Sequence, residues 1–79
     1  LHEKSEKAFK YTWRDIYIFA KLRNINLSDT THVSVNQYID GQKGIPVWEI
    51  DIRDSIQPDM AKVILIHGET GEVMMDSYE

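Results

Sequence analysis

Carboxylates are the most frequent reactive side chains in this sequence, which holds 13 acidic residues and three histidines but no cysteine. Asp51, Asp54 and Asp59 flank one short segment, and carboxylate oxygens are the ligands that Ca²⁺ prefers. Between them, however, Ile56 and Pro58 occupy positions where a calcium loop needs ligands and a flexible backbone. The spacing therefore favours solvated loop carboxylates, and we expect no metal site.

The histidines are too far apart in the sequence to form a recognisable metal motif. His2, His32 and His67 belong to no HxxH or HExxH pattern, and His67 ends an apolar stretch, as expected of a histidine at the end of a strand. The sequence contains no Gly-rich phosphate loop, and its serines stand in no nucleophile-elbow context. We therefore expect no bound cofactor.

Pairs of carboxylates for acid–base catalysis could be drawn among Glu49, Asp51, Glu69 and Glu72. Such catalysis needs a concave, partly dry pocket that shifts a pKa. A sheet of this size with one helix offers little depth, so the sequence predicts a protein that is not an enzyme. A hydrolase that uses the loop acids with a metal ion is the weakest of the alternatives.

The charge of the chain argues against nucleic acid as a partner. The net charge is −4, whereas phosphate contacts need a basic face. Residues 1–23 carry six basic and three acidic side chains, and the rest of the chain carries three basic and ten acidic ones. This asymmetry could orient the domain near an anionic membrane surface or steer a charged partner, although ordinary solvated faces of opposite sign are the preferred explanation.

With 79 residues and 42% hydrophobic content, residues 1–79 form a single domain with one modest core. The longest apolar run, 16–20, is far shorter than the roughly 20 residues that span a bilayer.

A helix is predicted over about residues 3–24, where neither Gly nor Pro occurs. Five apolar side chains recur there at spacings of three and four and should share one buried face: Phe9, Trp13, Ile16, Tyr17 and Ala20.

A second, smaller apolar stripe is expected on nearly the opposite side of this helix. It comprises Tyr11, Ile18 and Leu22. One interpretation is a contact with a partner, a neighbouring domain or a second copy of the chain. The other is that Leu22, together with Ile25, closes the bottom of the core where the helix ends.

Four strands should follow the helix, at about 32–39, 45–53, 61–67 and 72–78. Alternation of apolar and polar residues is clearest in the second strand, where Trp48 should face the core. The third strand contains an unbroken apolar run and should lie centrally. Short, Gly-containing links predict an α+β fold, one N-terminal helix packed on a three- to four-stranded antiparallel α-β-β-β-β meander. Its exposed face should carry Ser34, Asn36, Glu49, Asp51 and Lys62.

Two stretches of the chain resemble PepSY and PepSY-like domains. That family has a strand of the type xWEVxV, a hairpin, a strand ending in VDxxTGEVL, and a preceding helix with one more strand. The matching stretches here are Pro46-Val47-Trp48-Glu49-Ile50-Asp51-Ile52 and Ala61-Lys62-Val63-Ile64-Leu65-Ile66-His67-Gly68-Glu69-Thr70-Gly71-Glu72-Val73-Met74. The chain departs from the pattern at His67, where the family more often has aspartate, and its helix is longer and more aromatic.

The resemblance implies a non-catalytic, extracytoplasmic bacterial module of the cell envelope or of secreted proteins, with a role in peptidase inhibition, assisted folding or protein binding. Its partner would be another protein or its own parent chain, and neither the partner's identity nor the oligomeric state follows from the sequence. Contacts are expected through a sheet edge around Asn36, by strand addition, or through Tyr11, Ile18 and Leu22. The alternative is a small apolar ligand held between helix and sheet near Trp13 and Trp48.

Overall fold

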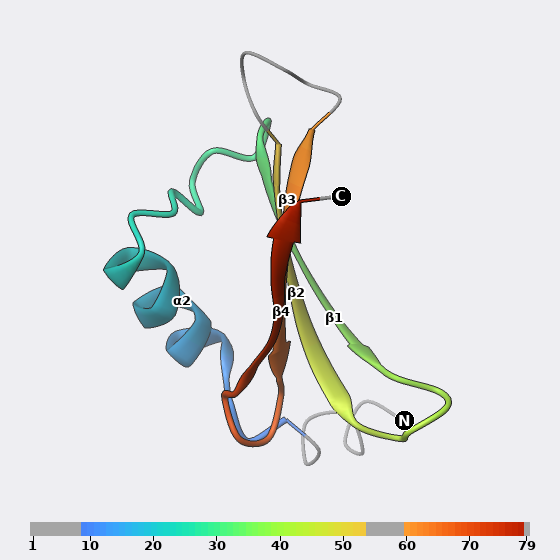
Figure 1. The fold of residues 1–79 in the computed structure, drawn as a ribbon. Coiled ribbons are helices and arrows are strands. Elements are labelled where there is room, and N and C mark those ends of the chain that lie inside the picture. Colours follow the sequence, from blue (N-terminus) through green and yellow to red (C-terminus); the bar gives the residue numbers. More distant parts are fainter. Residues whose placement is uncertain (1–8, 54–59, 79) are drawn as a thin grey trace.

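The computed structural model describes residues 9–53 and 60–78, and it has the predicted α+β fold (Figure 1). One helix, α2 (Trp13–Leu22), precedes four strands. They are β1 (Val33–Ile39), β2 (Pro46–Arg53), β3 (Ala61–His67) and β4 (Val73–Tyr78). The first strand residue of β2 is Pro46, where a missing N–H does least harm to the ladder.

All four strands form one antiparallel sheet in the order β1-β2-β3-β4, so each strand pairs with its neighbour in the sequence. The predicted meander is therefore confirmed, and β3 lies inside the sheet as expected. β1 and β4 form its two edges. In Figure 1 the sheet is seen nearly edge-on, with α2 alone on one side of it.

The helix begins later than predicted. Residues 9–12 are not helical, and residues 3–8 of the expected helix lie outside the described part of the chain. Thr12 is the N-cap: its backbone N–H and its hydroxyl both donate to the Asp15 carboxylate, at 2.7 and 3.1 Å. This carboxylate holds the first turn in place. Tyr11 consequently precedes the helix and cannot belong to a helical stripe with Ile18 and Leu22.

The end of α2 lies close to the predicted position and has a defined geometry. Asn24 adopts a positive φ of 59°, and the N–H groups of Asn24 and Ile25 donate to the carbonyls of Lys21 and Ala20. This pair of hydrogen bonds is the Schellman arrangement, in which asparagine replaces the more usual glycine. It turns the chain away from the helix axis and places Ile25 against the core.

The core lies between α2 and one face of the sheet. Its buried members are Phe9, Ile16, Trp48, Ile50, Ile64 and Ile66. Trp48 is only 5% exposed, which confirms its predicted place. Trp13 and Tyr17 were expected in the core, but they are 54% and 53% exposed. A helix lying on a sheet buries a narrow stripe, here Ile16 and Ala20, and leaves its flanks in solvent.

Lys62 was expected on the exposed face of the sheet, but this prediction is wrong. Lys62 lies on the face that α2 covers. It pairs with Ile52 of β2 and Tyr78 of β4, and paired residues of an antiparallel sheet share a face. Ser34, Asn36, Glu49 and Asp51 do lie on the face away from α2, as their register with one another requires.

Candidate functional site

The outer edge of β1 presents a row of backbone groups that no strand in the described part of the chain uses. Backbone hydrogen bonds from Arg53 N–H to His32 C=O and from Asp40 N–H to Ile45 C=O fix the phase of the β1–β2 ladder. Since hydrogen-bonded and non-hydrogen-bonded pairs alternate in antiparallel sheets, the even-numbered residues of β1 bond to β2. The N–H and C=O groups that point outward belong to Val33, Val35, Gln37 and Ile39, and of these the Val33 N–H donates to the Asp29 carbonyl at 2.9 Å.

This edge has none of the features that usually block strand pairing. β1 reads Val-Ser-Val-Asn-Gln-Tyr-Ile, without a charge or a proline, and pairs with β2 in one unbroken register. The other edge, β4, carries Asp76, and its pairing with β3 shifts register between Leu65 and Ile66. Charges and bulges are common protections of sheet edges. β4 is therefore the protected edge and β1 the open one.

Aromatic side chains lie beside β1 on the helix-covered face. The Trp13 ring lies 5.7 Å from the Trp48 ring, and Trp48 pairs with Gln37 of β1. A hollow of about 250 Å³ between the start of α2 and the sheet is lined by Phe9, Thr12, Trp13, Gln37 and Trp48. Beside the edge strand there is thus an apolar recess of side-chain size.

Acidic groups lie on the opposite face, one strand in from the same edge. By register Asp51 pairs with Ser34, and Glu49 pairs with Asn36. The Oδ1 atom of Asp51 is buried and accepts no hydrogen bond from any residue that the structure describes. Burial, followed by the negative charges of Glu49, Asp40 and Asp51, raises the pKa of Tyr38 on this face. Glu49, Asp40 and Asp51 thus lie near this side of β1, and Arg53 lines the same hollow as Glu49 and Asp51.

The predicted partner-binding residues do not form one surface. Ile18 and Leu22 lie one helical turn apart on α2 and are 50% and 81% exposed. Tyr11 is half-buried, and its backbone carbonyl accepts a hydrogen bond from the Trp48 indole at 2.7 Å. Asn36 lies on the edge strand, but its backbone N–H and C=O bond to β2. Only its side chain is therefore available to a partner.

A larger hollow lies at the other end of the helix from Trp13. It measures about 510 Å³ and is enclosed by the residues that follow α2, the loop before β1, and β1 to β3. Apolar residues in its lining are Ile25, Val33, Ile52 and Ile64, and charged ones are Arg23, Asp29, Arg53 and Lys62. The apolar ligand site expected from the sequence would lie near Trp13 and Trp48, where the recess is about half this volume.

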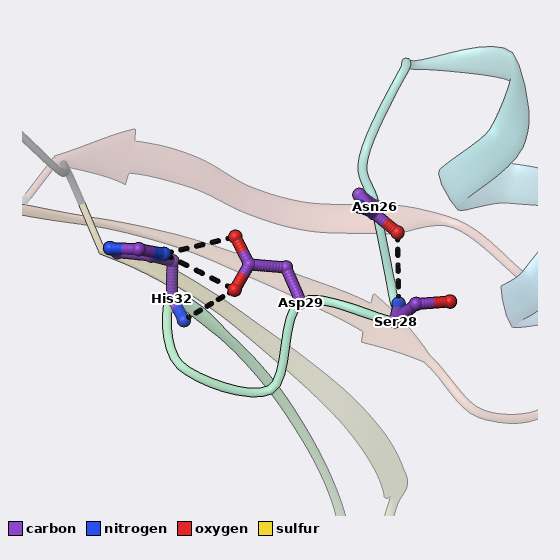
Figure 2. Close-up of polar contacts among 4 residues, drawn as sticks. All are labelled: Asn26, Ser28, Asp29 and His32. Atoms are coloured by element: carbon purple, nitrogen blue, oxygen red, sulfur yellow. Dashed lines mark hydrogen bonds and ion pairs between the residues drawn. The ribbon is translucent and has the colours of Figure 1, made fainter.

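The loop that borders this hollow is held by short-range hydrogen bonds (Figure 2). His32 Nδ1 lies 2.9 Å from Asp29 Oδ2, and the backbone N–H of Ser28 donates to Asn26 Oδ1 at 3.0 Å. The hydrogen bond with the His32 side chain is the main reason why the pKa of Asp29 is lowered. Turns of this kind give the loop a fixed shape without a helix or strand.

Asp76 of β4 links the end of the helix to the sheet. Its carboxylate oxygens lie 2.7 Å from Arg23 Nη1 and 3.1 Å from Lys62 Nζ. Hydrogen bonds from Lys62 and then from Arg23 lower the pKa of Asp76. The two cations thus meet at one acidic group beside the hollow.

We expect acid to destabilise the fold through this group. Because the pKa of Asp76 is lower in the folded state than in the unfolded state, its contribution is complete above about pH 4 and is lost as pH falls through the folded-state pKa. Thermal melts between pH 7 and pH 2 should show a smaller acid-induced loss of Tm for Asp76→Asn than for the wild type. Equal losses would mean that Asp76 makes no such contribution.

Among residues 9–53 and 60–78, no three histidine or acidic side chains gather as metal ligands, and no helix is long and apolar enough to cross a membrane. Asp54 and Asp59 lie outside the described residues. Comparison with known proteins adds no relative: no family model, no curated protein and no solved structure matches the chain.

Proposed function

We propose that this chain is a non-catalytic protein-binding module that receives an extended segment as a fifth strand beside β1. The observation that carries the proposal is the uncharged edge strand, whose outward side faces no other strand among residues 9–53 and 60–78. Strand addition is a common mode of peptide recognition, in which backbone hydrogen bonds supply affinity and alternate side chains supply specificity. The segment belongs to a partner protein or to the parent chain.

The two faces of the sheet define the side chains that such a segment should carry. Side chains on the helix-covered face would meet the recess beside Trp13, so apolar residues fit there. Side chains on the other face would lie about 10 Å from β2, two strand spacings away, where a long basic side chain can approach Glu49 and Asp51. The expected segment alternates apolar residues with Lys or Arg.

The biological setting that we propose follows from the resemblance to PepSY-like domains. The order of one helix and four meandering strands suits that family. On this basis the module would act in the bacterial cell envelope or in a secreted protein, as an inhibitor, folding aid or regulator of a peptidase. Capture of a peptidase from envelope fractions by the immobilised domain would support this setting.

Replacing Gln37 with proline should weaken binding of a strand-forming peptide roughly tenfold or more, because an outward N–H is lost and the ring crowds the incoming strand. The ladder to β2 should survive, since Gln37 donates no hydrogen bond to it. A fluorescently labelled ten-residue peptide that alternates valine with lysine is a suitable probe. Its affinity can be measured by fluorescence anisotropy.

Matched variants and peptides separate the edge from other surfaces. Gln37→Thr keeps the N–H and should bind like the wild type, and Leu22→Asp tests the exposed side of α2. A peptide with glutamate in place of lysine should bind more weakly. If Gln37→Pro, with an unchanged circular dichroism spectrum, binds as well as the wild type, strand addition at β1 is wrong.

A further inference from the structure

A polar hollow of about 380 Å³ lies on the face of the sheet away from α2, at the end where β1 begins. Apart from Val33 and Ala61, the residues that line it are polar, and Thr30, Thr31 and Ser34 contribute hydroxyl groups. Its volume lies within the range of sites that hold small molecules. Because so much of its wall is polar, a fitting occupant is small and polar as well.

The two ends of this hollow carry opposite charge. Glu49, Asp51 and Arg53 all line it, and they occupy alternate positions of β2. Alternate side chains of a strand point to the same face, so these three form a row whose members are about 7 Å apart along the strand. Two carboxylates are followed by one guanidinium group. A ligand that carries both a positive and a negative charge matches this row.

The adjacent Asp51 and Arg53 both lack a close partner of opposite charge. Asp51 is half-buried, and its Oδ1 atom is buried without a donor from any described residue. Because a carboxylate in this position is poorly solvated, a cation beside it would stabilise its charge. Arg53 is exposed and forms no ion pair within residues 9–53 and 60–78. Its guanidinium group is therefore available to an anion.

We infer that this hollow binds a free α-amino acid in its zwitterionic form. The ammonium group lies at Asp51, where the charge of Glu49 adds to the attraction, and the carboxylate lies at Arg53. An ammonium group supplies three donors, and the planar fork of a guanidinium group matches the two oxygens of a carboxylate. The inference goes beyond peptide binding at the β1 edge, since it uses side chains of β2 and no outward backbone group of β1.

Three small molecules of the same skeleton test the two charges separately. L-Serine carries both charges, ethanolamine lacks the carboxylate, and 3-hydroxypropanoate lacks the ammonium group. With ¹⁵N-labelled protein, L-serine should shift the amide signals of Ser34, Asp51 and Arg53 in a saturable way. Each of the other two should bind at least roughly tenfold more weakly, as expected when one charge-assisted hydrogen bond is missing.

Two variants test the two side chains. Arg53→Gln should weaken L-serine binding roughly tenfold without weakening that of ethanolamine, and Asp51→Asn should weaken it as much without weakening that of 3-hydroxypropanoate. Lys43→Gln and Glu72→Gln each remove one charge from a turn of the sheet and serve as matched controls, with no expected change. Gln37→Pro should bind L-serine like the wild type, so this result does not depend on strand addition.

Several results would overturn the inference. Equal affinities for L-serine and ethanolamine would mean that the hollow attracts any cation. Unchanged affinity for L-serine in either Asp51→Asn or Arg53→Gln would mean that the affected side chain does not contact it. Shifts that do not saturate, or that are confined to residues elsewhere in the fold, would rule out the site itself.

Discussion

Replacing Trp48 with alanine should lower the free energy of unfolding by about 3–5 kcal/mol, the range for large-to-small substitutions of buried aromatics. Its ring lies at the centre of the packing between helix and sheet. The Phe9 ring meets it edge to face, with 5.7 Å between ring centroids. The Trp13 ring lies at the same centroid distance, with its plane inclined by 33°. The indole N–H also holds the segment before α2 through the Tyr11 carbonyl. Urea unfolding followed by circular dichroism measures the loss.

A second substitution keeps this prediction testable if the alanine variant does not fold, since small domains have only about 5–15 kcal/mol of stability. Trp48→Phe retains an aromatic ring but leaves the Tyr11 carbonyl without its donor, which should cost about 1–3 kcal/mol. A loss below about 1 kcal/mol for Trp48→Ala would contradict the burial of this side chain.

Replacing Gly71 with alanine should destabilise the fold by roughly 2–4 kcal/mol, from two effects that add. Gly71 has a φ of +79°, which strains any residue with a side chain. A Cβ atom at this position would also lie 2.5 Å from the Tyr11 ring. The backbone of Tyr11 is held in place by its N–H, which donates to the Gly68 carbonyl at 2.8 Å, so the ring could move away only by rotation about its side-chain bonds.

The β1–β2 turn contains a matched control for this experiment. Gly44 has a similar φ, +69°, but a Cβ atom there would meet nothing within 4 Å. Gly44→Ala should therefore cost only the backbone strain, about 1–2 kcal/mol. Equal losses for the two alanine variants would show that Tyr11 does not pack against Gly71. If Tyr11 does pack there, the double variant Tyr11→Ala/Gly71→Ala should lack the steric part of the cost that Gly71→Ala shows alone.

The strands were predictable because their sequences alternate. In β2, Trp48, Ile50 and Ile52 alternate with acidic residues, so both the strand and its buried face could be read from the pattern. The third strand shows where this signal fails. Its run of apolar residues has no polar member in the middle to mark a face, and Lys62 was assigned to the wrong side.

Apolar periodicity alone predicts a helix that starts too early, because it carries no information about the N-cap. Phe9 continues the three-and-four spacing of α2 and is buried in the core, yet it belongs to a segment that is not helical. The signal that could have located the start is Thr12 followed three residues later by Asp15, whose carboxylate bonds back to Thr12.

The candidate sites were predictable only in part. That a sheet edge near Asn36 would be open follows from the meander, but which residues point outward depends on the phase of the β1–β2 ladder, and no residue type marks that phase. The hollow with Asp51 and Arg53 brings together the loop before β1 and three strands. Contacts between segments so far apart in the chain leave no periodic pattern in a sequence.

The meander order has a consequence for how the chain reaches its native state. Each strand pairs with the next one along the chain, so every hairpin closes a short loop at a small entropic cost. A ten-residue helix, in contrast, is too short to persist by itself in water. We therefore expect the sheet to assemble first and α2 to become helical only as Ile16 and Ala20 dock on it, late in folding.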